Sequence, residues 1–198
     1  KHRLNDEWEP FEDAMELKVF PFLSHLTLNK WHKNLYEYLE STPFIAELVL
    51  KNHNQTKLDF SKASVRMLSV DMTGVEELIL NDGLEELILL GEVREDCNIQ
   101  ANGNEEALLL HCNKVIPKLK GLEALGELHV GNIVELNIEE ILNAYPKLTE
   151  LRLWGKPGNL VHFDKLEKFQ QLEVFTTMDL FGFTAEDIQA PDRLPNLY

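Results

Sequence analysis

Two histidines and a glutamate in this sequence have side chains of the types that bind metal ions. His111, Glu127 and His129 offer two imidazoles and one carboxylate, which zinc, nickel and copper accept as ligands. Their spacing matches no local ligand pattern of known zinc sites, and the seven histidines of the chain fall on different repeats. We therefore expect these side chains to be exposed polar groups on a wall of the protein, with no metal site. A metal-dependent or hydrolytic site is kept as an alternative.

Other patterns that carry chemistry are missing from the sequence. It contains no GxSxG nucleophile elbow, no GxxxxGK[ST] loop, no GxGxxG fingerprint and no HExxH or EF-hand motif. Cys97 and Cys112 have neither CxxC spacing nor a neighbouring His or Cys cluster, so we expect buried free thiols in a reducing compartment. These observations predict a non-enzymatic protein without a cofactor.

The charge balance limits the partners that the protein can have. Its 198 residues include 34 acidic and 19 basic side chains, for a net charge of −15, so a nucleic-acid backbone would be repelled. No apolar run approaches the roughly 18 residues of a membrane span, and the opening KHRLNDEWEP has no hydrophobic region of a signal peptide. We expect a soluble, cytoplasmic protein with no membrane partner. The first residue is Lys rather than Met, which leaves open a missing N-terminal segment.

A repeated LxxLxL unit determines where all these side chains lie. We expect each copy, here termed a rung, to be a short strand whose leucines point inward, because one coil cannot bury that apolar face without neighbours. Nine rungs occur at intervals of 19 to 24 residues. Their middle anchors are Leu26, Leu48, Leu68, Leu87, Leu108, Leu128, Leu151, Phe175 and Leu197.

With these rungs the chain resembles a leucine-rich repeat protein, of an irregular, short-repeat and bacterial kind. The resemblance implies an α/β solenoid with a parallel β-sheet on the inner wall and mixed short strands and helices on the outer wall. The family usually places Asn or Cys three residues after the last strand leucine, and here Asn113 alone fits. A regular asparagine ladder and smooth horseshoe curvature are therefore not expected. We divide the chain into an N-terminal cap, residues 1–22, and a repeat domain, residues 23–198, whose last rung is incomplete.

The segments between rungs predict two kinds of outer wall. Short strands are expected at 58–60, 78–80 and 97–99, and helices at 34–39 and after an Asn137 N-cap, with further helical turns at 163–169 and 184–187. The stretch VEELILNDGLEELILLG, residues 75–91, looks locally like a β-hairpin. The repeat instead predicts that its two halves lie on different walls, with Asn81, Asp82 and Gly83 forming a corner.

Side-chain alternation places the residues between the leucines on the outer surface of the sheet. This surface gains an apolar patch at its centre, an aromatic and basic group toward the C-terminal end, and an acidic stripe that includes Glu47. Trp, Tyr, Met and Arg are enriched at protein interfaces. The expected partner-binding residues are Glu86, Ile88, Leu90, Leu109, His111, Glu127, His129, Glu150, Arg152, Trp154, Met178 and Tyr198.

These features predict a scaffold that binds another protein, one with a basic rim and an apolar knob, on its concave sheet surface. By resemblance it would neutralise a toxin or recognise an effector. A second possibility by resemblance is the substrate-recognition domain of a larger enzyme, such as a bacterial leucine-rich repeat ubiquitin ligase, although the regular LP and Asn of those repeats are missing. A third reading is that Trp154 and Met178 merely cover strand edges.

Overall fold

The computed structural model describes residues 23–101, 108–112, 121–162, 168, 170–178 and 196, and within 132–137, 142 and 156–162 it describes the backbone alone. Several predictions lie outside this part of the chain. They are the N-terminal cap at 1–22, Asn113 of the asparagine position, most of the helical turn at 163–169, the turn at 184–187 and the anchor of the ninth rung at Leu197.

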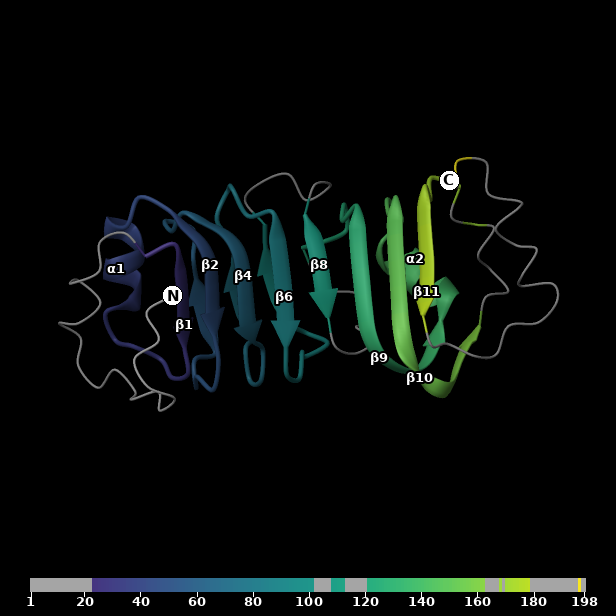
Figure 1. Ribbon diagram of the computed structural model, residues 1–198, viewed down its shortest axis with the longest axis horizontal. Coiled ribbons are helices and arrows are strands. Elements are labelled where there is room, and N and C mark those ends of the chain that lie inside the picture. Colours follow the sequence, from purple (N-terminus) through teal and green to yellow (C-terminus); the bar gives the residue numbers. More distant parts are fainter. Residues whose placement is uncertain are drawn as a thin grey trace.

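The described chain winds as a β-solenoid around one long parallel sheet (Figure 1). Eight strands stand side by side in sequence order, and every neighbouring pair is parallel. Each parallel connection requires the chain to leave the sheet and return, which is what a solenoid coil does. The strands are β1 (His25–Leu28), β2 (Ile45–Leu50), β4 (Val65–Asp71), β6 (Glu86–Leu90), β8 (Leu109–Cys112), β9 (Glu127–Asn137), β10 (Glu150–His162) and β11 (Val174–Met178).

Stacked leucines of successive strands form the core. Each anchor leucine is directly opposite the next one, and from β1 to β10 none is more than 5% exposed. Full burial of a leucine contributes about 1.5–3 kcal/mol, so the column is a principal source of stability. The paired residues are Leu26, Leu48, Leu68, Leu87, Leu110, Leu128, Leu151 and, at the end of the row, Phe175.

The fifth rung is displaced from its predicted position. Leu110, not Leu108, lies opposite Leu87 and Leu128. Both leucines are buried, and the segment Ala107 to Leu110 offers hydrophobic residues in either register, so local sequence did not distinguish them. A shift of two residues keeps each side chain on the same face of the sheet but places it opposite a different residue of the neighbouring strand.

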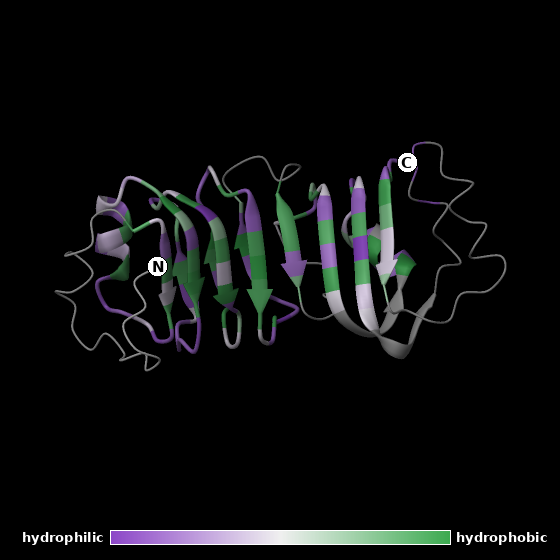
Figure 2. Ribbon diagram, in the orientation of Figure 1, coloured by the Kyte–Doolittle hydropathy of each residue, from purple (hydrophilic) through white to green (hydrophobic). Residues whose placement is uncertain are grey.

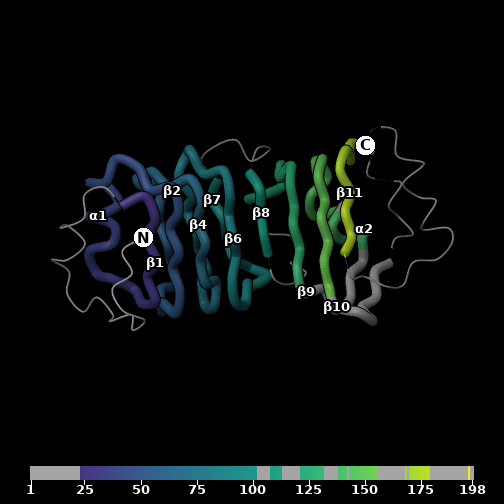
Figure 3. Tube along the Cα trace, viewed as in Figure 1, coloured from purple at the N-terminus to yellow at the C-terminus, as the bar shows by residue number. Residues whose placement is uncertain are grey.

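A second, three-stranded sheet forms part of the opposite wall, as the short-strand prediction required. It consists of β3 (Lys57–Asp59), β5 (Glu77–Ile79) and β7 (Asn98–Gln100), each one residue from its predicted position. Leu78 pairs with Leu58 and Ile99, so residues 75–91 do not form a hairpin. In Figure 3 the tube leaves the main sheet after β4 and returns to it at β6.

The corner between β5 and β6 is fastened by a buried asparagine. Asn81 is 5% exposed, and its Nδ2 donates a hydrogen bond to the carbonyl oxygen of Val65, 2.8 Å away, at the start of β4. This bond joins one coil to the preceding one, because β4 and β6 are neighbours in the main sheet. Asn81 thus makes a coil-to-coil bond of the kind expected of a regular asparagine ladder, but at a different corner.

Two α-helices occur in the described part of the chain, α1 (Leu35–Ser41) and α2 (Ile138–Ala144). Leu35, Tyr38 and Leu39 form the buried face of α1, as predicted, and the hydroxyl of Thr42 donates to the carbonyl oxygen of Tyr38 at the helix end. α2 begins directly after Asn137, and Ile138 and Ile141 are buried. α1 lies at the N-terminal end of the row of strands and α2 behind its C-terminal part (Figure 1).

Strands β9 and β10 extend beyond the main row, which the sequence did not predict. After a register irregularity at Gly155, the two strands pair again, from Glu135 opposite Leu160 to Asn137 opposite His162. Figure 1 shows both strands bending away from the row at their ends.

Cys97 and Cys112 are both buried and free, as predicted. None of the described helices is long and apolar enough to cross a membrane.

Candidate functional site

The candidate site is the face of the main sheet that lies opposite the core, here termed the sheet face. Along each strand, buried leucines alternate with partly or fully exposed side chains, for instance in β6 and β8. Figure 2 shows this alternation as green and purple bands on β9 and β10. Because the strands are paired in register, the exposed side chains form columns that cross the sheet.

One of these columns is acidic, as predicted. Strand pairing aligns Glu47, Glu86, Glu127 and Glu150 in a single line across the sheet. Glu127 and Glu150 are immediate neighbours in this line, whereas Leu109 separates Glu86 from Glu127. The corrected fifth rung places Leu109 in this column, where the sequence had placed Ala107.

A shallow depression of about 580 Å³ follows this column. Its lining contains four glutamates against Arg66 and His25, and Arg66 is already paired with Glu85 at 2.6 Å. The depression therefore carries excess negative charge, which favours a cationic group. Its lining residues are His25, Ala46, Glu47, Arg66, Met67, Glu85, Glu86, Leu109 and Glu127.

The predicted apolar patch is less prominent in the structure than in the sequence. Ile88, Leu90 and Leu109 are each partly buried, and none of them is among the large exposed apolar side chains. The register shift also places His111, not Leu109, opposite Ile88. The patch is thus interrupted, because the register shift places Leu109 opposite Glu86 instead of Ile88.

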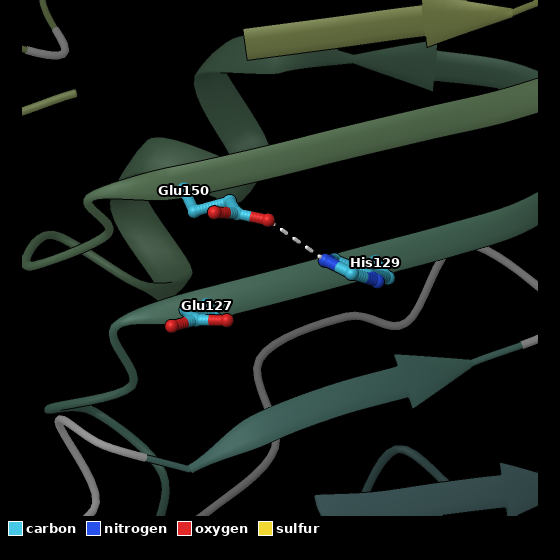
Figure 4. A group of neighbouring side chains, drawn as sticks. All are labelled: Glu127, His129 and Glu150. Atoms are coloured by element: carbon cyan, nitrogen blue, oxygen red, sulfur yellow. Dashed lines mark hydrogen bonds and ion pairs between the residues drawn. The ribbon is translucent and has the colours of Figure 1, made fainter. Parts of the chain in front are cut away.

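Glu127, His129 and Glu150 form a compact group of polar side chains on the sheet face (Figure 4). One ligand atom from each lies within 4.8 Å of the others. His129 Nε2 donates a hydrogen bond to Glu150 Oε1 over 3.1 Å, and Arg152 Nε donates to the same oxygen over 2.5 Å. Figure 4 shows the Glu150 carboxylate pointing from β10 toward β9, which carries the other two.

Burial and charge perturb the ionisation of all three groups. Burial, with the charge of Glu150, raises the pKa of Glu127. Burial, with nearby His111, lowers the pKa of His129 despite the hydrogen bond to Glu150. Burial alone would raise the pKa of Glu150, but the hydrogen bonds from Arg152 and His129 outweigh it and lower that pKa. The result is a neutral imidazole between two carboxylates, of which Glu150 is the better stabilised as an anion.

His111 packs beside this group without joining it. Its ring meets that of His129 edge-on, with centroids 4.6 Å apart. His111 Nε2 is 2.7 Å from Glu86 Oε1, within ion-pair distance, yet this buried nitrogen makes no hydrogen bond among the described residues. We therefore treat the contact as a close approach of the two groups rather than a hydrogen bond. Of the predicted metal trio, Glu127 and His129 come together, and Glu150 rather than His111 completes the group.

The C-terminal part of the sheet face carries two large exposed apolar side chains. Trp154 is 36% and Met178 60% exposed, and they lie opposite each other on β10 and β11. The Trp154 indole meets the His129 ring with centroids 5.7 Å apart. A Cβ at Gly131 would lie 2.6 Å from Trp154 Nε1, so the absence of a side chain there makes room for the indole.

Most of the residues expected to bind a partner lie on this one face. Arg152, Trp154 and Met178 group together as predicted, whereas Tyr198 lies outside the described residues. The sequence did not single out Arg66, Glu85 or Gly131. Arg66 and Glu85 could have been found from the residues that precede each strand anchor by two, and Gly131 from its place beside Trp154 after register alignment.

No family model matches this chain, and no curated protein or solved structure matches it either. Its candidate function is therefore argued from the geometry and chemistry of the sheet face.

Proposed function

We propose that this protein is a non-enzymatic binding module that holds another protein on the sheet face. The observation that carries the proposal is the pairing of Trp154 with Met178. These are two of the three large apolar side chains that are exposed in the described residues, and they lie on adjacent strands of one face. Exposed Trp and Met that form a continuous surface are typical of interface centres.

The charge of the same face supports a basic partner. The acidic column runs across the sheet from Glu47 on β2 to Glu150 on β10, with the depression along it, while Trp154 and Met178 lie on β10 and β11 at its C-terminal end. A partner with an apolar knob and a basic rim would match both features. Complementary charge of this kind accelerates association, and the effect decreases as salt screens it.

The rigid coils below the surface suit a preformed binding site. Strand pairing holds the side chains in fixed columns, so the ordering cost of binding is low. We extend the proposal to a leucine-rich repeat type of solenoid that acts in the cytoplasm and neutralises a toxin or recognises an effector. The repeated anchor leucines and the buried free thiols Cys97 and Cys112 support that extension.

The test uses affinity capture followed by quantitative binding with the captured protein. Trp154→Ala and Met178→Ala should each weaken binding, with Trp154→Ala costing about 2 kcal/mol or more, as for a hot-spot residue. Phe44 provides a matched control because it is the third exposed large apolar residue, at 50%, and precedes β2. At roughly 4.8 Å per strand it lies about 24 Å from β10 along the sheet.

Phe44→Ala should therefore leave the affinity unchanged. The association rate of the unmodified protein should fall with added salt, because the acidic column would attract the partner. Full affinity of the Trp154→Ala and Met178→Ala variants, or equal loss in Phe44→Ala, would show that the partner does not use this surface.

A further inference from the structure

The group formed by Glu127, His129 and Glu150 has a composition that protein binding alone does not require. Two carboxylates are neighbours in the acidic column, and the imidazole stands next to both. In the described part of the chain, Glu150 has partners in Arg152 and His129, while no hydrogen bond or ion pair reaches the Glu127 carboxylate. Like charges held this close repel each other, and a cation between them would relieve that repulsion.

We propose that Glu127, His129 and Glu150 bind a divalent transition-metal ion of the zinc class on the sheet face. An imidazole with two carboxylates is a donor set that Zn²⁺ accepts, whereas Ca²⁺ and Mg²⁺ favour oxygen ligands alone. With three protein ligands, the remaining coordination position is open to water or to a side chain of a partner. This site goes beyond the proposed protein binding and does not depend on it.

The distances fit such an ion after a small adjustment. Ligands about 2.1 Å from zinc in a tetrahedral site are roughly 3.4 Å apart. His129 Nε2 and Glu150 Oε1 are already 3.1 Å apart, and no ligand atom is more than 4.8 Å from another. Rotation of the Glu127 side chain, which has no bond to break among the described residues, would close the remaining gap.

The state of each ligand also fits. A metal ligand must be a neutral imidazole, and His129 Nε2, the nitrogen that faces Glu150, would bind the ion with the ring proton on Nδ1. Glu150 Oε1 accepts from both His129 and Arg152 among the described residues, so an ion held by His129 Nε2 and Glu150 would take the place of the hydrogen bond between these two side chains. The edge-on packing of His111 and Trp154 against the two sides of the group holds the His129 ring in place. Arg152 opposes the ion by its charge, so binding must outweigh that repulsion.

The test titrates the purified, tag-free chain with Zn²⁺ and with Co²⁺ by calorimetry. One ion per chain should bind, and Ca²⁺ or Mg²⁺ at the same concentration should not. Glu127→Gln and His129→Gln each remove one ligand while keeping similar size, and each should weaken Zn²⁺ binding by more than about 100-fold, beyond the effect of an outer-shell partner. Circular dichroism checks that both variants fold.

His25 and Glu47 form a matched control pair. They face each other across β1 and β2 with Nε2 and Oε2 4.0 Å apart, but they are much more exposed, at 66% and 40%, and no third ligand joins them within the part of the chain that the structure describes. His25→Gln should leave Zn²⁺ binding unchanged. A second readout is the quenching of Trp154 fluorescence by Co²⁺, since the indole packs on His129. Trp154→Phe should remove the quenching while calorimetry still detects the ion.

Three results would overturn the proposal: no Zn²⁺ binding, unchanged binding in Glu127→Gln or His129→Gln, or equal binding of Ca²⁺. Loss of partner binding in Trp154→Ala with Zn²⁺ binding retained would support both proposals separately. Because the titration contains no partner, its failure would leave the protein-binding proposal to be judged by its own variants.

Discussion

A close backbone approach at Gly121 gives the most direct test of how the coils stack. Gly121 has a φ of +93°, and a Cβ added there would lie 1.7 Å from the carbonyl oxygen and 2.9 Å from the carbonyl carbon of Ile99. Ile99 is the middle residue of β7, the last strand of the outer sheet. Gly121 thus covers the edge of that sheet at a distance that no other residue type permits.

The cost of Gly121→Ala has two parts that a matched variant can separate. A non-glycine residue at positive φ costs about 1–2 kcal/mol, and the clash with backbone atoms, which cannot rotate away, adds about 1–3 kcal/mol or more. Gly74 has a φ of +81° but nothing within 4 Å of its added Cβ, so Gly74→Ala should show the first part alone. At about 2–4 °C per kcal/mol for a chain of this size, we expect a melting temperature lower by about 2–8 °C for Gly74→Ala and by roughly 10 °C for Gly121→Ala.

Thermal and urea unfolding followed by circular dichroism would measure both variants beside the unmodified chain. Gly91→Ala should fall between them, because its Cβ would meet the side-chain oxygens Asp71 Oδ1 and Thr73 Oγ1, which can move. Equal destabilisation by Gly74→Ala and Gly121→Ala would refute the close approach, and with it the placement of Gly121 against β7.

Two further predictions concern ionisable groups. Burial raises the pKa of Cys97 to about 11 and that of Cys112 to about 12, so neither thiol should react with a disulfide reagent such as DTNB at about pH 8 until urea unfolds the chain; rapid labelling of the native protein would contradict the burial. Burial alone would raise the pKa of Asp71, but hydrogen bonds from Thr73 and from the backbone of Asn52, with the charge of His53, outweigh it and hold that pKa below 3.8. A lowered carboxyl pKa stabilises the fold above the usual value and loses that contribution as the pH falls through the folded value, so the urea midpoint should drop below about pH 4, and less steeply in Asp71→Asn; parallel curves for the two proteins would be inconsistent with this.

The stacking order followed from the sequence because the pattern is periodic. Anchors such as Leu48, Leu68 and Leu87 recur at nearly constant spacing, and each short strand can bury its leucines only against the neighbouring rung. The same periodicity resolved the ambiguous residues 75–91, since Leu78 and Leu87 had to lie on different walls. Local turn signals at Asn81 and Gly83 pointed to a hairpin and were overridden.

The sequence did not determine the strand register of a rung that has leucines at several candidate anchor positions. Leu108 and Leu110 are chemically equivalent candidates, and the pairing of β8 with both β6 and β9 selected the second. The paired extensions of β9 and β10 had no signal either, because they follow a register irregularity at Gly155. Such choices depend on what the neighbouring coil offers, which no local pattern contains.

The sequence by itself determined the parallel solenoid, the inward leucines and the alternation that turns Glu127, His129, Glu150 and Trp154 onto one face. Those features are consequences of a period-2 side-chain pattern repeated at fixed intervals. Tertiary structure decided which of these side chains touch. His129 is hydrogen-bonded to Glu150, whereas His111 only packs against its ring, and the indole of Trp154 lies against Gly131. These contacts depend on strand register and on side-chain rotamers.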